Sequence, residues 1–457
     1  MSHGGTRSLA CRPMHEDLAA AVDADFERVR RELEDLVRIP SVSAPDFDPS
    51  VVRRSADAVA ALLTESGLSN VELLEIEGAH PAVYGEIAGP AGAPTVLLYA
   101  HHDVQPPGPA EEWRSDPFEP EEHNGRLYGR GVADDKAGVV IHAAAIRAHQ
   151  RDLPVSVKVF IEGEEEVGST NVEAFLDEYA DRLAADVVVI ADSGNWREGL
   201  PSLTTSLRGL VDLVVEVRTL DTAVHSGQFG GTVPDAIMVL SRMIASLHDD
   251  EGNVAIGGLI SDDADDLGLT DEEFRRQIGV VDGVELIGSG SLTARRWRKP
   301  AISILAIDAP PISQAINQIV PTARAKISMR IAPGQLPEDA TAALVDHLES
   351  AVPWGAQVTV TEGASGEPFE ANTGDRVARI FAEALAAGYD NDVAEIGVGG
   401  SIPIVSAFQA AHPGASIVLY GVADPTSRTH GPNESVSLQD LRNGAVSEAI
   451  ALRLLAQ

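Results

Sequence analysis

The strongest constraint on the fold is an alternation of short apolar runs with helix-like patterns in the N-terminal part of the chain. Apolar runs at 95–100, 155–161 and 187–191 alternate with helical patterns at 137–149 and 171–183, after an amphipathic helix expected at 16–38. Strands that alternate with helices form βαβ units around a parallel sheet. We therefore expect an α/β fold built on a parallel sheet.

The pattern changes after Asp192, which indicates a second domain. Apolar and polar residues alternate at 207–219, 301–307 and 323–331, as in half-buried strands, and helices are expected at 235–248 and 337–351. The first pattern resumes with a helix at 375–387, a strand at 415–421 and a closing helix from 438. We expect one domain formed by 1–205 and 370–457, interrupted by an inserted α+β domain at 206–369.

Charge and cysteine content exclude several classes of protein. The chain has 34 Lys+Arg against 70 Asp+Glu, a formal net charge of −36, so we expect neither nucleic acid nor membrane as a partner. The low lysine content fits either a GC-rich coding style or a salt-adapted surface. The single cysteine, Cys11, excludes an intrachain disulfide, and its preceding residues lack the apolar segment of a lipoprotein signal. A cytoplasmic protein is expected.

Ionisable residues follow the expected strands. The clusters are His101-His102-Asp103 after the first strand, Glu162 to Glu166 after the second, Asp192 after the third, His430 after the strand at 415–421, and Asp134-Asp135 in the turn before the helix at 137–149. Because ligands of open α/β sheets bind at the carboxyl ends of the strands, these five clusters can converge.

The residue types at these ends suit a metal centre. Two imidazoles with several carboxylates and no cysteine are typical of zinc, manganese or cobalt at an open catalytic site. Each residue alone has an ordinary explanation as a helix cap or a charged surface residue, and we expect His102 only to pack beside His101. His101 and Asp103, two residues apart on an extended strand, share a face, so that the carboxylate can orient the imidazole of a metal ligand.

Six segments of the chain, in order, resemble one known family. They are YAHHDVQP at 99–106, GRLYGRGVADDKAG at 125–138, EGEEEVGS at 162–169, Asp192, HSGQFGG at 225–231 and HGPNE at 430–434. Together they resemble the co-catalytic zinc peptidases, which include carnosinases, aminoacylases, succinyl-diaminopimelate desuccinylases and glutamate carboxypeptidases. The runs at 113–120 and 297–304 look most like the dipeptidase branch. The resemblance implies a parallel-sheet catalytic domain with an inserted α+β lid and dimerisation domain.

The resemblance also implies a site for two divalent metal ions per subunit, expected to be Zn²⁺, with Mn²⁺ or Co²⁺ as alternatives. His101 and Asp192 would bind one ion, Glu166 and His430 the other, and Asp134 both. Asp103 would orient His101, and Glu165 would be the general base for a metal-bridged hydroxide. In this family the peptide bond that corresponds to Asp134-Asp135 is often cis, and we expect the same here.

Residues of the inserted domain are implied in substrate binding. His225 would reach across a homodimer interface and stabilise the oxyanion in the partner's site. Arg330 and Asn317 would bind the free carboxylate of the substrate, and Gly400 and Ser401 would approach its backbone. The loop departs from the family pattern because Gly397 and Val398 replace a charged pair, so the specificity pocket is expected to differ.

The predicted function is that of a metal-dependent dipeptidase that hydrolyses dipeptides with a free C-terminal carboxylate. An N-acyl-amino-acid deacylase would use the same metals and base and remains an alternative. A non-catalytic metal-binding scaffold is a third possibility, but such a protein has no need of a base at Glu165 beside the metal-ligand positions.

Overall fold

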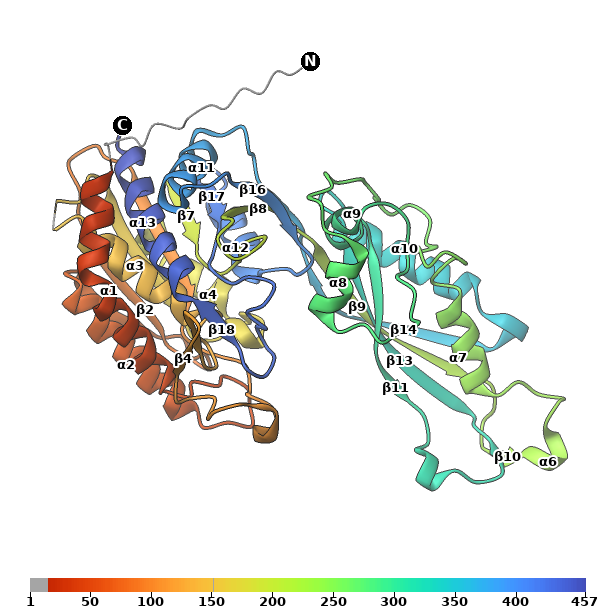
Figure 1. Ribbon diagram of the computed structural model, residues 1–457. Coiled ribbons are helices and arrows are strands. Elements are labelled where there is room, and N and C mark those ends of the chain that lie inside the picture. Colours follow the sequence, from red (N-terminus) through yellow and green to blue (C-terminus); the bar gives the residue numbers. More distant parts are fainter. Residues whose placement is uncertain (1–14, 151) are drawn as a thin grey trace, which may run out of the picture. The chain divides into compact units, whose positions relative to one another are not determined.

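The computed structural model describes residues 15–150 and 152–457, which form two compact units (Figure 1). The first unit comprises the described residues up to Leu203, together with Asn372–Glu395 and Ala407–Gln457. The second comprises Thr204–Ala371 and Ile396–Ser406. The cysteine considered above, Cys11, lies outside the described residues. No helix in the described part of the chain is long and apolar enough to cross a membrane.

Among the described residues, the first unit contains six strands of a nine-stranded sheet, in the order β1-β2-β6-β3-β7-β17. Its strands are β1 (Ser69–Leu74), β2 (Ala82–Ile87), β3 (Thr95–His101), β6 (Ser156–Glu162), β7 (Val187–Ile190) and β17 (Ser416–Leu419). β3 runs parallel to β6 and β7, and β17 runs parallel to β7, whereas β2 is antiparallel to its neighbours. The expected α/β fold is therefore confirmed. The carboxyl ends of the parallel strands meet at one edge of the sheet.

Helices cover this sheet because their apolar residues recur at helical spacing. The helices of the first unit are α1 (Glu16–Val37), α2 (Pro49–Glu65), α3 (Lys136–Ala148), α4 (Val172–Glu178), α5 (Ala180–Leu183), α11 (Arg376–Tyr389) and α13 (Leu438–Leu455). α3 is almost entirely buried and packs against α1 and α13, and the three lie side by side in Figure 1. The helix expected at 171–183 is divided into α4 and α5 at Tyr179.

Short elements complete the first unit. The strands β4 (Glu121–His123), β5 (Arg126–Tyr128) and β18 (Ser435–Ser437) form a small antiparallel sheet, and the 3₁₀ helices are η1 (Ala110–Glu112) and η2 (Glu165–Val167). Asp135 caps the N-terminus of α3 by accepting a hydrogen bond from the backbone N–H of Gly138. The turn before α3 is thereby tied to the helix.

The second unit contains an antiparallel sheet with the strand order β11-β13-β9-β14. These strands are β9 (Gly209–Arg218), β11 (Ala301–Asp308), β13 (Thr322–Ile331) and β14 (Gln357–Gly366), and the helices α7 (Ala236–Ala245) and α10 (Pro337–Ser350) pack on them. β13 alternates buried and exposed residues over most of its length, as expected. β11 does not: Leu305 and Ile307 are 56% and 53% exposed, since this strand is an edge of the sheet and its register shifts between Ile304 and Ala306.

The remaining elements of the second unit are short. They are β10 (Val224–His225), α6 (Ser226–Phe229), α8 (Asp271–Ile278), α9 (Leu292–Trp297), η3 (Ile312–Gln314), β12 (Gln318–Ile319), η4 (Pro353–Gly355) and β15 (Phe369–Glu370), while β8 (Ser202–Leu207), β16 (Ala394–Val398) and α12 (Pro403–Ala411) extend over a boundary between the units. Ile396–Ser406 belongs to the second unit, although the sequence places it in the first domain. Hydrogen bonds from Arg208 to the carbonyl of Gly399 and from Arg330 to Ser401 hold it there.

Candidate metal centre

The expected ligand positions all lie in the first unit, at or near the edge where the parallel strands end. His101 is the last residue of β3, Asp192 follows β7, and Glu166 lies in η2, which begins three residues after the end of β6. Asp134 lies in the turn before α3, and His430 lies in the loop between β17 and β18. These positions follow from the parallel order of β6, β3, β7 and β17, which brings segments distant in the sequence to one edge.

Asp134 lies between the two histidines. Its Oδ1 is 3.0 Å from Nε2 of His101, and its Oδ2 is 3.0 Å from Nε2 of His430. Nε2 of His101 is also 3.9 Å from Oδ1 of Asp192, and Nε2 of His430 is 3.2 Å from Oε2 of Glu166. Each oxygen of Asp134 therefore belongs to a different cluster of donor atoms.

These donors fit two metal ions. His101, Asp134 and Asp192 place one donor atom each within 4.8 Å of one another, and so do Asp134, Glu166 and His430. Each group combines imidazole nitrogen with carboxylate oxygen, the donors of open zinc, manganese and cobalt sites. Because the groups share Asp134, the two positions are adjacent. The peptide bond between Asp134 and Asp135 is cis, which confirms the expectation from the resemblance.

Asp103 connects the expected ligand His101 to the segment that carries Glu165 and Glu166. Its Oδ1 lies 3.3 Å from Nδ1 of His101 and accepts a hydrogen bond from the backbone N–H of Glu165. Its Oδ2 accepts hydrogen bonds from the backbone N–H of Glu166 and from the hydroxyl of Ser43. All of this carboxylate is buried, so its hydrogen bonds hold both segments without competition from water.

Burial and close contacts shift the pKa values of the acids and histidines in the centre. Burial raises the pKa of Asp192 to about 7, and the nearby carboxylates of Asp134 and Glu166 add to this shift. Burial opposes ionisation of His101 as well, but its hydrogen bonds with Asp103 and Asp134 raise its pKa well above the usual value. Hydrogen bonds to Asp134 and Glu166 raise the pKa of His430 to about 10.

Glu165 stands apart from these pairs. Burial raises the pKa of its carboxyl well above the usual value, and the charges of Asp192, Asp134 and Glu166 contribute to the shift. Within the described residues, the carboxylate of Glu165 forms no hydrogen bond or ion pair, while the backbone of the same residue is held by Asp103. A fixed, unpaired carboxylate with a raised pKa has the properties of a general base.

The second unit holds the remaining sequence-predicted residues, and of these the structure brings the side chains of Arg330 and Ser401 into contact. Nη1 of Arg330, at the end of β13, donates to Oγ of Ser401 at 3.2 Å. His225 on β10 pairs with Gln318 on β12, directly after Asn317, and the carbonyl of Asn317 accepts the N–H of Ser226. Gly400 lies next to Ser401, and a Cβ placed on it would meet no atom closer than 4.0 Å.

Comparison with known proteins identifies the chain. Residues 97–453 match the family described as Peptidase family M20/M25/M40. The chain belongs to this family. As an M20 peptidase it is a metallopeptidase, which confirms the resemblance read from its motifs.

Similar proteins place this M20 peptidase in the dipeptidase branch, as expected. A cysteinylglycine-S-conjugate dipeptidase of Corynebacterium striatum is 34% identical over 431 residues, covering 93% of this chain and 94% of that protein. A Beta-Ala-His dipeptidase of Homo sapiens is 27% identical over 440 residues, covering 91% and 84%. The crystal structure of human carnosine dipeptidase 1 has a TM-score of 0.81 at 25% identity, and the match covers 98% of this chain and 100% of that chain.

Several residues around the metal centre of this M20 peptidase were not singled out from the sequence. Gln105 donates from its backbone and its side chain to the carboxylate of Glu166, and Glu434 accepts the backbone N–H of Asp134. Gln105 lies in the segment 99–106 and Glu434 in the segment 430–434, so their place in these motifs could have marked them as site residues. Ser43, which donates to Asp103, lies far from any motif.

Two further arginines of this M20 peptidase were also missed. Arg208 and Arg296 lie near Arg330, and within residues 15–150 and 152–457 none of the three guanidinium groups forms an ion pair. Burial lowers the pKa of Arg208, and the neighbouring positive charges of Arg330 and Arg296 lower it further, to about 10. Partly buried arginines without carboxylate partners can accept an anionic group of a ligand.

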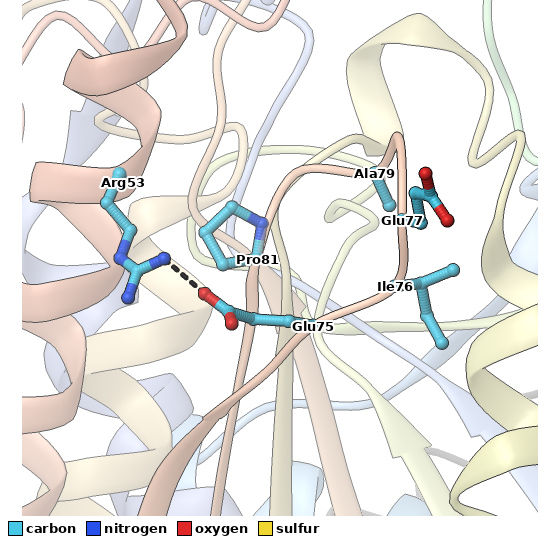
Figure 2. Close-up of a pocket in the computed structure, with 6 residues that line it drawn as sticks. All are labelled: Arg53, Glu75, Ile76, Glu77, Ala79 and Pro81. Atoms are coloured by element: carbon cyan, nitrogen blue, oxygen red, sulfur yellow. Dashed lines mark hydrogen bonds and ion pairs between the residues drawn. The ribbon is translucent and has the colours of Figure 1, made fainter.

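A surface pocket of about 350 Å³ in the first unit is separate from the donor groups (Figure 2). Its lining residues are Arg53, Glu75, Ile76, Glu77, Ala79 and Pro81. Arg53 and Glu75 form an ion pair across it and balance each other's charge. No metal-donor residue lines this pocket, so we assign it no part in the chemistry.

Proposed function

We propose that this M20 peptidase is a metal-dependent dipeptidase that hydrolyses the amide bond of dipeptides with a free C-terminal carboxylate. The observation that carries the proposal is the position of Asp134, whose two oxygens each lie 3.0 Å from Nε2 of a different histidine. The similar proteins, which are dipeptidases by name, support the same activity.

We assign His101 and Asp192 to one cation and Glu166 and His430 to the other, with Asp134 binding both. Zn²⁺ is the proposed metal, since mixed imidazole and carboxylate donors suit it, and Mn²⁺ or Co²⁺ would be accommodated by the same donors. When bound, the two cations supply Lewis-acid chemistry that activates water and polarises an amide carbonyl. All ligands would bind as neutral imidazoles or ionised carboxylates.

In this proposal Glu165 performs the proton transfers. Its carboxylate takes a proton from the attacking water and delivers it to the nitrogen of the leaving amine. Asp103 holds the backbone of Glu165 and orients His101, so it positions both the base and a ligand.

We assign substrate carboxylate binding to the second unit. Arg330 can form two charge-assisted hydrogen bonds with a carboxylate. Ser401 lies within hydrogen-bond distance of the Arg330 guanidinium group. The guanidinium groups of Arg208 and Arg296, which have no carboxylate partner in the described part of the chain, support an anionic ligand nearby. That of Arg208 also donates to the carbonyls of Gly399 and Lys299. Asn317 and Gly400 are assigned to the same binding role, Gly400 because the space beside it leaves room for the backbone of a substrate.

His225 is assigned to oxyanion stabilisation in the partner subunit of a homodimer. Its Nδ1 accepts a hydrogen bond from the backbone N–H of Gly227 at 3.0 Å, so a neutral ring carries its proton on Nε2 and can donate it. Exposed apolar residues on the edge strand β11, Leu305 and Ile307, support the second unit as the lid and dimerisation domain. Light scattering of the purified chain tests the dimer. We further propose a cytoplasmic location.

Substrate panels test the proposed activity. We expect higher kcat/KM for dipeptides than for the matching N-acetyl amino acids in the metal-loaded enzyme. The second candidate, an N-acyl-amino-acid deacylase, uses the same metals and base, and Gly397 and Val398 in place of the family's charged pair indicate a specificity pocket that differs from the family pattern. Faster turnover of the acetylated compounds would establish the deacylase, and no turnover of either panel with two ions bound would support a metal-binding scaffold.

A further inference from the structure

A buried ion pair outside the ligand set joins two loops of the metal centre. Nη1 of Arg130 lies 2.6 Å from Oε2 of Glu434, and the side chains are 1% and 0% exposed. The two residues are 304 positions apart in the sequence. Arg130 precedes Asp134 in the turn before α3, and Glu434 follows His430 in the loop before β18, so the pair connects the segments that carry these two donors.

Glu434 holds the turn that contains Asp134. Its Oε1 accepts hydrogen bonds from the backbone N–H groups of Ala133 and Asp134 at 3.0 and 3.2 Å. Its Oε2 accepts the backbone N–H of Gly131 at 3.1 Å in addition to Arg130. Each oxygen thus has two donors, and the carboxylate fixes the backbone up to the shared ligand.

Arg130 holds the loop that contains His430. Its Nη2 donates to the carbonyl of Gly431, the residue after His430, at 3.2 Å. His430 has a φ of 62°, a left-handed conformation that a non-glycine residue rarely adopts without support from its surroundings. The ring of Trp113 covers the guanidinium group, with 5.5 Å from its centroid to Cζ.

The two donor groups depend on these loops to different extents. The group of His101, Asp134 and Asp192 takes His101 from a strand and Asp192 from the residues that follow one. The group of Asp134, Glu166 and His430 takes both Asp134 and His430 from the loops joined by the pair. His430 is 57% exposed, so surrounding side chains give it little support of their own.

We propose that Arg130 and Glu434 are positioning residues that set the affinity of the metal position formed by Asp134, Glu166 and His430. The position formed by His101, Asp134 and Asp192 depends on them less. This inference rests on the proposed dinuclear centre. Neither residue is a ligand, and both act through the backbone of the loops that carry Asp134 and His430.

The test is a titration of metal-free protein with Co²⁺, followed by calorimetry and by the visible absorption of the bound ion. Glu434→Gln keeps the size of the side chain but turns one oxygen into a donor that faces other donors. Arg130→Lys keeps the charge but cannot contact Glu434 and Gly431 together. We expect both variants to weaken one of two binding events by about 10–100-fold and to weaken the other, which shares Asp134, at least about threefold less.

Arg147→Met is the matched control. Arg147 is a partly buried arginine of the same unit that bonds Asp25, Glu32 and Ser66, and it contacts neither loop. We expect it to lower the thermal stability without changing either Co²⁺ affinity, which separates positioning from general destabilisation.

The inference would be overturned if either soluble variant weakened both Co²⁺ binding events equally. It would also be overturned if neither variant weakened any binding event. If Glu434→Gln does not fold, Arg130→Lys decides alone. A wild-type protein that binds no Co²⁺ would overturn the metal centre itself, and this inference with it. This failure of the metal centre is distinguishable from failure of the inference because it is seen in the wild-type protein.

Discussion

Oδ1 of Asp103 accepts a hydrogen bond from the backbone N–H of Glu165, with 3.2 Å between the two atoms. The same oxygen lies 3.3 Å from Nδ1 of His101. One buried carboxylate therefore sets the position of a proposed metal ligand and of the proposed base. Nδ1 of His101 also lies 3.1 Å from the backbone carbonyl of Asp103.

Asp103→Asn should reduce both metal affinity and turnover. The Asn amide keeps one acceptor oxygen, and its NH₂ group can only donate. This NH₂ group would face donors among His101, Ser43, Glu165 and Glu166, so at least one of these contacts is lost. We expect a loss of about 10–100-fold in kcat/KM, as is typical when a group that supports a metal ligand is changed. Asp48→Asn, which alters an exposed helix cap in the same unit, is the control and should leave kcat/KM unchanged. Unchanged kinetics in Asp103→Asn would show that Asp103 does not support the centre.

Glu165→Gln should abolish turnover and leave metal content unchanged. The amide cannot accept a proton, and we expect kcat to fall by at least about 100-fold, the lower end for loss of a general base. Elemental analysis of the same sample should give the wild-type metal content, because Glu165 is not assigned as a ligand. Glu173→Gln, an exposed position on α4, serves as the control. Hydrolysis at the wild-type rate by Glu165→Gln would remove Glu165 from the mechanism.

Arg330→Lys should raise KM for dipeptides by about 10–100-fold, the equivalent of roughly 1.5–3 kcal/mol for a charge-assisted hydrogen bond. Dipeptide amides lack the C-terminal carboxylate, so their KM should change far less. Arg324→Lys, on the same strand but exposed and paired with Asp308, is the matched control. An equal rise in KM for the dipeptides and their amides would contradict the assignment of Arg330 to the carboxylate.

Stability should depend on pH through His142, which lies on α3 in the core of the first unit. Its Nδ1 is 2.8 Å from a carboxylate oxygen of Glu448 and its Nε2 is 3.0 Å from the carbonyl of Tyr99, so both nitrogens act as donors. Burial opposes this charge, but Glu448 outweighs it and raises the pKa of His142 above 6.5. The folded state therefore binds this proton more tightly than the unfolded state does.

The sign of the effect follows from that difference. The stabilisation by protonated His142 is fully present below the unfolded pKa of about 6.5 and is lost as pH rises through the raised folded pKa. In urea denaturation, the advantage of the wild type over His142→Gln should shrink as pH increases from 6 to 9. His123→Gln, which removes an exposed histidine beside Glu121, should show little change. An advantage that grows with pH would mean that His142 is neutral in the fold.

The elements with long apolar periodicity could be predicted from the sequence, and those defined by their surroundings could not. α1, β3 and α3 lie within a residue or two of their expected ranges, because their buried faces recur at regular spacing. α2 was not predicted, although Asp48 and Pro49 form a typical helix start. The exposure of β11 depends on its place at the edge of the sheet, which its own alternation does not encode.

The candidate site divides in the same way. The convergence of the five clusters could be predicted because each lies at or near a strand end or in the turn before α3, and parallel order brings such positions together. The proposed ligand in each cluster was implied by the resemblance. The contact between Arg130 and Glu434 could not, since residues 304 positions apart meet only through the tertiary fold. Arg208 and Arg296 were missed for a related reason: a lone arginine gives no sign that it lacks a carboxylate partner.

The central claim is that five side chains hold two metal ions around Asp134, and the most direct test is the Zn²⁺ stoichiometry of the wild-type protein. Metal-free protein should be dialysed against Zn²⁺ and its bound metal counted per chain, with Asp134→Ala beside it. The account predicts two ions per wild-type chain and weakened binding of both in Asp134→Ala, because this residue belongs to both donor groups. A wild-type chain that binds one ion or none at saturating Zn²⁺ would contradict it.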